Sequence, residues 1–171
     1  MTPWMRTLHK WVGLIVGLQF VVWLGSGLMM SLLDPDKIEG SAQQAAAVAN
    51  PAWPATAVSP SVALAAAKGE AATLDSGWLL QQPVYRLQSP EGTEVIDARD
   101  GKRIAIDAAV AAKVAQAAYA GDGVAAAPQY LEKTLETRAN PDPVWRVDFS
   151  DAQDTSIYVS AHSGQVMEHR N

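Results

Sequence analysis

The longest apolar run in the chain lies close to its N-terminus. Residues 11–33 contain no ionisable side chain. As a helix rising about 1.5 Å per residue they would reach roughly 34 Å, which exceeds the hydrocarbon core of about 30 Å in a typical bilayer. The pattern therefore predicts one transmembrane helix over residues 11–33, preceded by a short tail at residues 1–10.

The charges that flank this run predict its orientation. Arg6 and Lys10 precede it without any acid, whereas Asp34 and Asp36 follow it. Positive residues stay on the cytoplasmic side of a membrane, so the tail is expected in the cytoplasm and residues 34–171 outside. A cleaved signal peptide is the competing interpretation. Its apolar core would be only about 7 to 15 residues long, ahead of a small-residue cleavage site that this sequence lacks.

Composition narrows the setting and the partners. Two of the thirteen basic residues and none of the eighteen acidic ones precede residue 34, so the remainder carries a net charge of −7. Such an acidic part argues against nucleic acid as a partner. The absence of cysteine excludes disulfides, iron–sulfur clusters and thiolate metal sites. This composition fits the periplasmic side of a bacterial inner membrane.

A linker is expected between the membrane helix and the rest, over residues 34–59. This stretch is rich in alanine and proline and has no sustained apolar periodicity, which is typical of a semi-extended tether. Trp53 is its one bulky residue. We expect it to pack on the folded part of the chain or at the membrane interface rather than to bind a ligand.

An internal repeat organises the remaining residues. The segment 83–87, Pro-Val-Tyr-Arg-Leu, returns at 143–147 as Pro-Val-Trp-Arg-Val. Alanine-rich helical stretches precede the two copies, at residues 61–68 and 108–120. Ser59 and Asp107 are the N-terminal caps expected for these helices, and Gly69 and Gly121 are the expected stops.

Each copy then shows short β-rich runs separated by turns, at residues 89–92 and 100–101 in the first copy and 151–154 and 163–164 in the second; the Asp-Gly and Ser-Gly pairs among them are hairpin signals. The expected strands are 84–88, 93–98 and 102–106 in the first copy, and 144–149, 155–161 and 165–169 in the second. The predicted fold class is α+β: a single N-terminal transmembrane helix followed by two tandem units, residues 60–106 and 107–171. Each unit is a helix covering a three-stranded antiparallel meander. Tyr85 and Trp145 are expected at equivalent buried positions, with Arg86 and Arg146 on the opposite faces.

Two motifs carry a resemblance to a known family. Residues 157–166, Ile-Tyr-Val-Ser-Ala-His-Ser-Gly-Gln-Val, resemble the closing motif of a PepSY domain. Residues 6–14, Arg-Thr-Leu-His-Lys-Trp-Val-Gly-Leu, are similar to the PepSY-associated transmembrane helix. The resemblance implies either a partner-binding or inhibitory module, or a haem-containing inner-membrane reductase of iron–siderophore complexes. Those reductases have several membrane spans, whereas one is predicted here.

His9 is the one candidate for cofactor binding, as a ligand of haem b. With Gly13 and Gly17 it falls at i, i+4 and i+8 on one helix face, where a porphyrin could approach the backbone and the imidazole could serve as axial ligand. The glycines equally suit a close-packed neighbouring helix, and His9 equally suits the membrane interface. Gln19, in mid-span, is expected to hydrogen-bond a neighbouring helix.

Other candidate chemistry is sparse. His162 and His169 lack the surrounding ligands of a metal site, and no metal site is predicted. The sequence contains no hydrolase, zinc-protease or nucleotide-binding motif, so no catalytic residue is predicted. The carboxylates Asp97, Asp100 and Asp148 are expected at turns and strand surfaces.

Two hypotheses for the function follow. The first is a non-catalytic, inner-membrane-anchored periplasmic module without a cofactor. It would be an accessory or partner-binding subunit that contacts the lipid bilayer and a membrane protein or a second copy of itself. The second is a haem-dependent redox component of the iron–siderophore reductase type, which depends on His9 and on the family resemblance.

Overall fold

The computed structural model describes residues 3–32, 43–68, 73–134, 137 and 142–170. The chain divides into two compact units, Met1–Glu39 and Gly40–Asn171. We call the second unit the folded domain.

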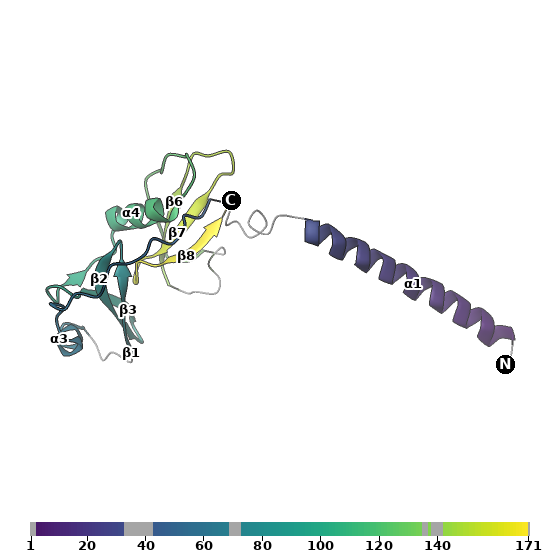
Figure 1. Cartoon of the computed structure of the whole chain (residues 1–171), viewed down its shortest axis with the longest axis horizontal. Coiled ribbons are helices and arrows are strands. Elements are labelled where there is room, and N and C mark those ends of the chain that lie inside the picture. Colours follow the sequence, from purple (N-terminus) through teal and green to yellow (C-terminus); the bar gives the residue numbers. More distant parts are fainter. Residues whose placement is uncertain (1–2, 33–42, 69–72, 135–136, 138–141, 171) are drawn as a thin grey trace. The chain divides into compact units, whose positions relative to one another are not determined.

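The first unit contains one continuous helix, α1, over Pro3–Leu32 (Figure 1). It includes most of the predicted tail, because no residue between Thr7 and Lys10 breaks a helix and Pro3 is favoured at the first helical position. All of its side chains are exposed. The helix is long and apolar enough to cross a membrane.

The first half of the folded domain holds a short helix and a sheet (Figure 1). Helix α3 spans Pro60–Ala65. Four antiparallel strands follow in the order β1-β2-β3-β4. They are β1 (Thr73–Leu79), β2 (Gln82–Ser89), β3 (Gly92–Asp97) and β4 (Arg103–Ile104).

The second half repeats this order with a longer helix. Helix α4 spans Ala108–Ala118, and the carboxylate of Asp107 caps it by accepting a 2.9 Å hydrogen bond from the Val110 amide, as predicted. The second sheet has the order β5-β6-β7-β8. Its strands are β5 (Gln129–Leu131), β6 (Val144–Asp148), β7 (Ser156–Ser160) and β8 (Val166–Arg170).

The number of strands corrects the sequence prediction, because each sheet has four strands and not three. The additional strands, β1 and β5, come first in their sheets. The turn from β1 to β2 explains why β1 was missed. Leu80 and Gln81 occupy it with φ of 52° and 63°. Hairpin turns with positive φ usually contain Asn or Gly at these positions, and neither is present here. Strand β5 is too short to show alternation.

One apolar core joins the two sheets and α4. Its buried side chains come from β1, β2 and β3 of the first sheet, from α4, and from β6 and β7 of the second. The largest of them are Leu79, Val84, Val95, Ile106, Val114, Tyr119, Val147, Phe149, Ile157 and Val159. The two sheets therefore share a core, in place of each sheet closing on its own helix alone.

The opposite face of the first sheet is also covered. Tyr85, Leu87 and Ile96 are buried there against Ala63 of α3. Side chains alternate along a strand, so Val84 and Arg86 face the shared core while Tyr85 faces α3. The predicted separation of Tyr85 from Arg86 is thus confirmed.

Trp145 departs from the prediction. It is only half-buried, beside the shared core, whereas Tyr85 is 4% exposed. Its indole Nε1 donates a 2.9 Å hydrogen bond to the carbonyl of Ile106. The indole therefore links the second sheet to the segment that leads into α4. Because its N–H group makes this hydrogen bond, the ring lies at the edge of the core.

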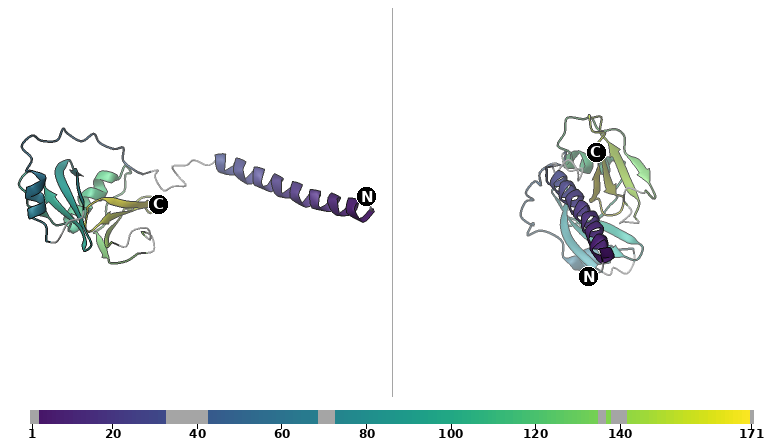
Figure 2. Two further views of the ribbon diagram at one scale, coloured as in Figure 1. Left: turned by 90° about the horizontal axis from the view of Figure 1, so that it is seen from below. Right: turned by 90° about the vertical axis from the view of Figure 1, so that its right-hand side faces the viewer.

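The described part of the predicted linker, residues 43–59, is attached to the folded domain. Ala45 donates to the Ala118 carbonyl at 2.8 Å, and Val58 donates to the Ala98 carbonyl at 2.7 Å. Between these points the ring of Trp53 packs 5.5 Å from that of Tyr85. Figure 2 shows this segment crossing the domain as an extended trace. We call residues 43–59 the strap.

The helix ends differ in detail from the prediction. Helix α3 begins after Ser59, whose hydroxyl pairs with Ser61 at 2.7 Å and makes no capping bond to the backbone. Helix α4 ends at Ala118, with Tyr119 as its C-cap, ahead of the expected stop at Gly121. The other expected stop, Gly69, lies outside the described residues.

Because the core is shared, the folded domain should unfold in a single transition. Ile157→Ala removes a fully buried side chain of this core and should lower the free energy of unfolding by about 3 kcal/mol. Val124→Ala, at a position 74% exposed, should change it by less than about 0.5 kcal/mol. Calorimetry of the full chain in detergent would measure both effects, and two separate domain transitions would contradict the shared core.

Candidate functional site

The predicted membrane face lies on α1. A continuous α-helix turns about 100° per residue, so His9, Gly13 and Gly17 advance by only about 40° at each step and lie on one side. A Cβ atom built on Gly13 or Gly17 would meet nothing within 4 Å outside the helix's own backbone. The two glycines therefore present bare helix backbone over two turns.

Gln19 lies on a different side of α1. It is two residues beyond Gly17, about 200° around the helix axis, and is thus nearly opposite to it. Ser26 falls on the same side as Gln19, seven residues on, and its hydroxyl donates to the Trp23 carbonyl at 2.9 Å within the helix. A neighbour on the glycine face and a neighbour that hydrogen-bonds Gln19 would therefore be two different neighbours.

The residues of α1 supply half of what a b-type haem requires. His9 is the only histidine of α1, so a second imidazole ligand would have to come from another helix. Within the described part of the chain, no group of three or more His, Asp or Glu side chains could hold a metal ion. His9 remains a candidate ligand, and Gly13 and Gly17 remain a candidate packing face.

His162 occupies the turn between β7 and β8, where it packs against the turn between β2 and β3. Its Nδ1 atom lies 4.0 Å from an oxygen of Asp142 and is buried without a hydrogen bond. A side chain on Gly92, whose φ is +125°, would collide with this imidazole. Its position is thus fixed by the contact between the two sheets. His169 lies apart from it, in β8.

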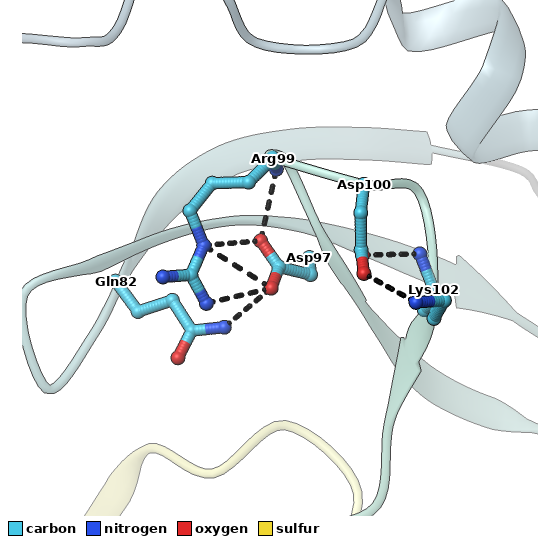
Figure 3. A network of polar contacts seen from close by, with 5 residues as sticks. All are labelled: Gln82, Asp97, Arg99, Asp100 and Lys102. Atoms are coloured by element: carbon cyan, nitrogen blue, oxygen red, sulfur yellow. Dashed lines mark hydrogen bonds and ion pairs between the residues drawn. The ribbon is translucent and has the colours of Figure 1, made fainter.

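The carboxylates at the end of β3 form two local ion pairs (Figure 3). Asp97 accepts from Arg99 at 2.8 Å and from Gln82 at 2.7 Å, and the hydrogen bond from Arg99 is the main reason that its pKa is lowered. Asp100 pairs with Lys102 at 2.9 Å. Asp97 is the last residue of β3 and is 8% exposed, so it is a buried strand residue, whereas a turn or strand-surface position was predicted.

Asp151 organises the turn between β6 and β7. Its carboxylate accepts from the Thr155 hydroxyl at 2.6 Å and from the Tyr119 hydroxyl at 2.8 Å, and also from two backbone amides of the turn. Burial disfavours the charged form, but the hydrogen bonds, led by those from Thr155, outweigh it and lower the pKa to about 2. The hydrogen bonds of this carboxylate therefore stabilise the turn and attach it to Tyr119 at the end of α4.

An open groove of about 780 Å³ lies at the joint between the two sheets of the folded domain. The strap forms one side. The β1–β2 turn, the end of α4 and the β7–β8 turn form the rest. Its lining is mostly small and apolar, and Arg86 is its only charged residue: Gln44–Val48, Asn50, Gly77–Gln81, Arg86, Val114, Ala117, Ala118 and Gly164–Val166. We call it the strap groove.

Arg86 bridges the two sheets beneath this groove. Its Nε donates to the Ser163 carbonyl at 3.2 Å, and its Nη2 donates to the Trp78 carbonyl at 2.9 Å. A Cβ atom on Gly77 would stand 2.5 Å from Nη1, so only glycine lets the guanidinium lie across β1. Burial lowers the pKa of Arg86, and the charge of Asp75 opposes this shift.

The alternation of residues in β2 correctly predicted the face on which Arg86 lies, but it indicated no role for this residue. The available signal was a basic residue flanked by Tyr85 and Leu87, both of which proved to be buried. Gly77 carried no signal of its own, because β1 was not predicted. The strap groove could not have been found from the sequence, since its walls come from four segments spread over more than a hundred residues.

The second half of the folded domain has the architecture of a small α+β module, one helix over an antiparallel sheet. Residues 105–170, which include α4 and all four strands of the second sheet, match the family described as Peptidase propeptide and YPEB domain, or PepSY. The chain therefore contains a PepSY domain, as its closing motif predicted. No curated protein and no solved structure matches the chain.

The low pKa of Asp151 predicts an acid sensitivity. Its folded-state pKa of about 2 lies below the ordinary value of 3.8, so its contribution to stability is complete above about pH 4 and is lost as the pH falls towards 2. Thermal melts of the full chain between pH 6 and 2 should show a smaller decrease for Asp151→Asn than for the wild type. Equal decreases would contradict the assignment.

Proposed function

We propose that the chain is a non-catalytic module anchored in a bacterial inner membrane, where it binds and steadies a partner protein. The observation that carries the proposal is the combination of one long apolar helix with a PepSY domain. In the described residues, the carboxylates with lowered pKa values are committed to turns. This arrangement favours a binding role over a chemical one.

The proposed organisation assigns residues 1–10 to a cytoplasmic tail, 11–33 to the membrane and 34–59 to the connecting segment. The first sheet with α3 (60–106) and the PepSY domain (107–171) would then be tandem units of common origin. The repeat of Val84–Leu87 at Val144–Val147 supports this, because both segments lie in the second strand of a four-stranded antiparallel sheet. The family match covers the second unit only.

The orientation is open to a direct test. Arg6 and Lys10 are not opposed by any acid before residue 34, so residues 34–171 should be periplasmic. Alkaline phosphatase fused after Asn171 should be active in intact bacterial cells, and a reporter that works only in the cytoplasm should be silent there. The reverse pattern would overturn the assignment.

A partner helix, or a second copy of α1, is proposed on the glycine face. The double substitution of Gly13 and Gly17 by leucine should leave membrane insertion intact, because leucine favours the bilayer. It should also remove the partner, because packing through bare backbone is lost. Co-purification in mild detergent, together with crosslinking for self-association, would measure this loss.

The matched control is Gly25→Leu, compared with Gly13→Leu, because Gly25 is twelve residues beyond Gly13, about 120° around the helix axis, and so lies off the glycine face. Each single variant gains one leucine, so any difference between them reports the position. Recovery of the partner at wild-type yield with both variants would contradict the glycine face. The same preparation tests the haem hypothesis, since a Soret band that disappears in His9→Ala would favour the redox component.

A further inference from the structure

We infer that the strap groove binds an extended peptide segment through one acidic side chain, with Arg86 as the residue that recognises its carboxylate. The inference rests on the proposed function as a partner-binding module and names the chemistry of the partner segment. It concerns the folded domain alone and is independent of the glycine face of α1.

In the described residues, Arg86 donates hydrogen bonds only to backbone carbonyls and not to a carboxylate. A guanidinium offers five N–H donors, and two of them make the hydrogen bonds to Ser163 and Trp78. Both acceptors are neutral carbonyls. No carboxylate of the described residues lies within ion-pair distance of Arg86. Asp75, opposite Arg86 on β1, acts on it through its charge without a hydrogen bond, so an incoming carboxylate would add the charge-assisted hydrogen bonds that the half-buried guanidinium lacks.

The residues around Arg86 indicate which side chains the rest of the ligand should carry. The strap and α4 contribute mainly alanines. The polar residues of the lining other than Arg86 are uncharged: Gln44, Asn50, Gln81 and Gln165. The groove therefore offers mixed, uncharged surface around a single charge. This suits one carboxylate on an otherwise uncharged segment. A polyanion would meet one favourable contact and the repulsion of a strongly acidic domain.

The backbone at the groove favours an extended peptide. Strand β1 is at the edge of its sheet, and its backbone pairing in the described residues is with β2 only. Between the attachments at Ala45 and Val58, the strap makes no described backbone hydrogen bond to β1. An edge strand beside an open groove can accept a peptide as an additional strand, and 780 Å³ is within the range of ligand pockets.

Two features of the groove keep Arg86 in place for this role. Gly77 admits the guanidinium across β1, and the β7–β8 turn, which belongs to the PepSY motif, supplies the Ser163 carbonyl that orients it. The turn residues Leu80 and Gln81, held with positive φ, form the lip of the groove. Such strained non-glycine positions concentrate at binding sites.

The test uses the full chain in detergent micelles and a labelled probe peptide. The probe is acetyl-Ser-Val-Ala-Glu-Ala-Val-Ser-amide with a neutral fluorophore, compared by fluorescence anisotropy with the same peptide carrying Gln for Glu. The glutamate peptide should bind about tenfold more tightly, as expected for hydrogen bonds that involve charged groups. Arg86→Gln should abolish this preference. Arg99→Gln, which removes the same charge from a turn outside the groove, should retain it.

A second variant protects the test against misfolding of Arg86→Gln. Gln165→Glu leaves Arg86 in place and adds a carboxylate to an exposed position of the groove lining. It should raise the melting temperature and abolish the preference for the glutamate peptide by competition. Equal affinity for the two peptides, binding of neither, or an unchanged preference in Gln165→Glu would overturn the inference. None of these results would bear on the membrane partner, which is tested through Gly13 and Gly17.

Discussion

The folded domain depends on the apolar core that its two sheets share. Val84 and Val95 of the first sheet and Ile157 and Val159 of the second are buried in the same cluster, with α4 contributing Val114 and other side chains. A small antiparallel sheet is stable only when its apolar face packs against another element. Each sheet therefore provides part of the cover that the other lacks, and the strap groove, Arg86 and the β7–β8 turn all occur where the two meet.

The contact between the two sheets explains the structural role of the PepSY motif. The motif residues 157–166 form β7, the following turn and the start of β8. Ser163 receives the hydrogen bond of Arg86, and Gly164 approaches Leu79 and Ile106 so closely that a side chain there would have to displace them. With φ of +67°, Gly164 also occupies a backbone conformation that other residues rarely adopt. The motif thus fits the second sheet to the first.

Most of the local structure could be predicted from the sequence because local signals governed it. The apolar run predicted α1, the carboxylate of Asp107 predicted the start of α4, and β-rich runs bounded by turns at residues 89–92, 100–101, 151–154 and 163–164 predicted six strands. The additional strand β1 escaped because Leu80 and Gln81 turn the chain without glycine or asparagine. The half-burial of Trp145 and the closeness of Arg86 to Ser163 depend on contacts between the sheets. No periodicity within one segment reports such contacts.

The shared core also has a consequence for the order in which the chain acquires its structure. A polypeptide is synthesised from its N-terminus, and early segments generally fold first. The strands that carry Val84 and Val95 emerge long before Ile157 and Val159, which complete their cover. Until β7 has been made, the first sheet must present an apolar face to its surroundings. The nascent chain therefore carries an exposed apolar surface while the roughly fifty residues between Ile104 of β4 and Ser156 of β7 are being added.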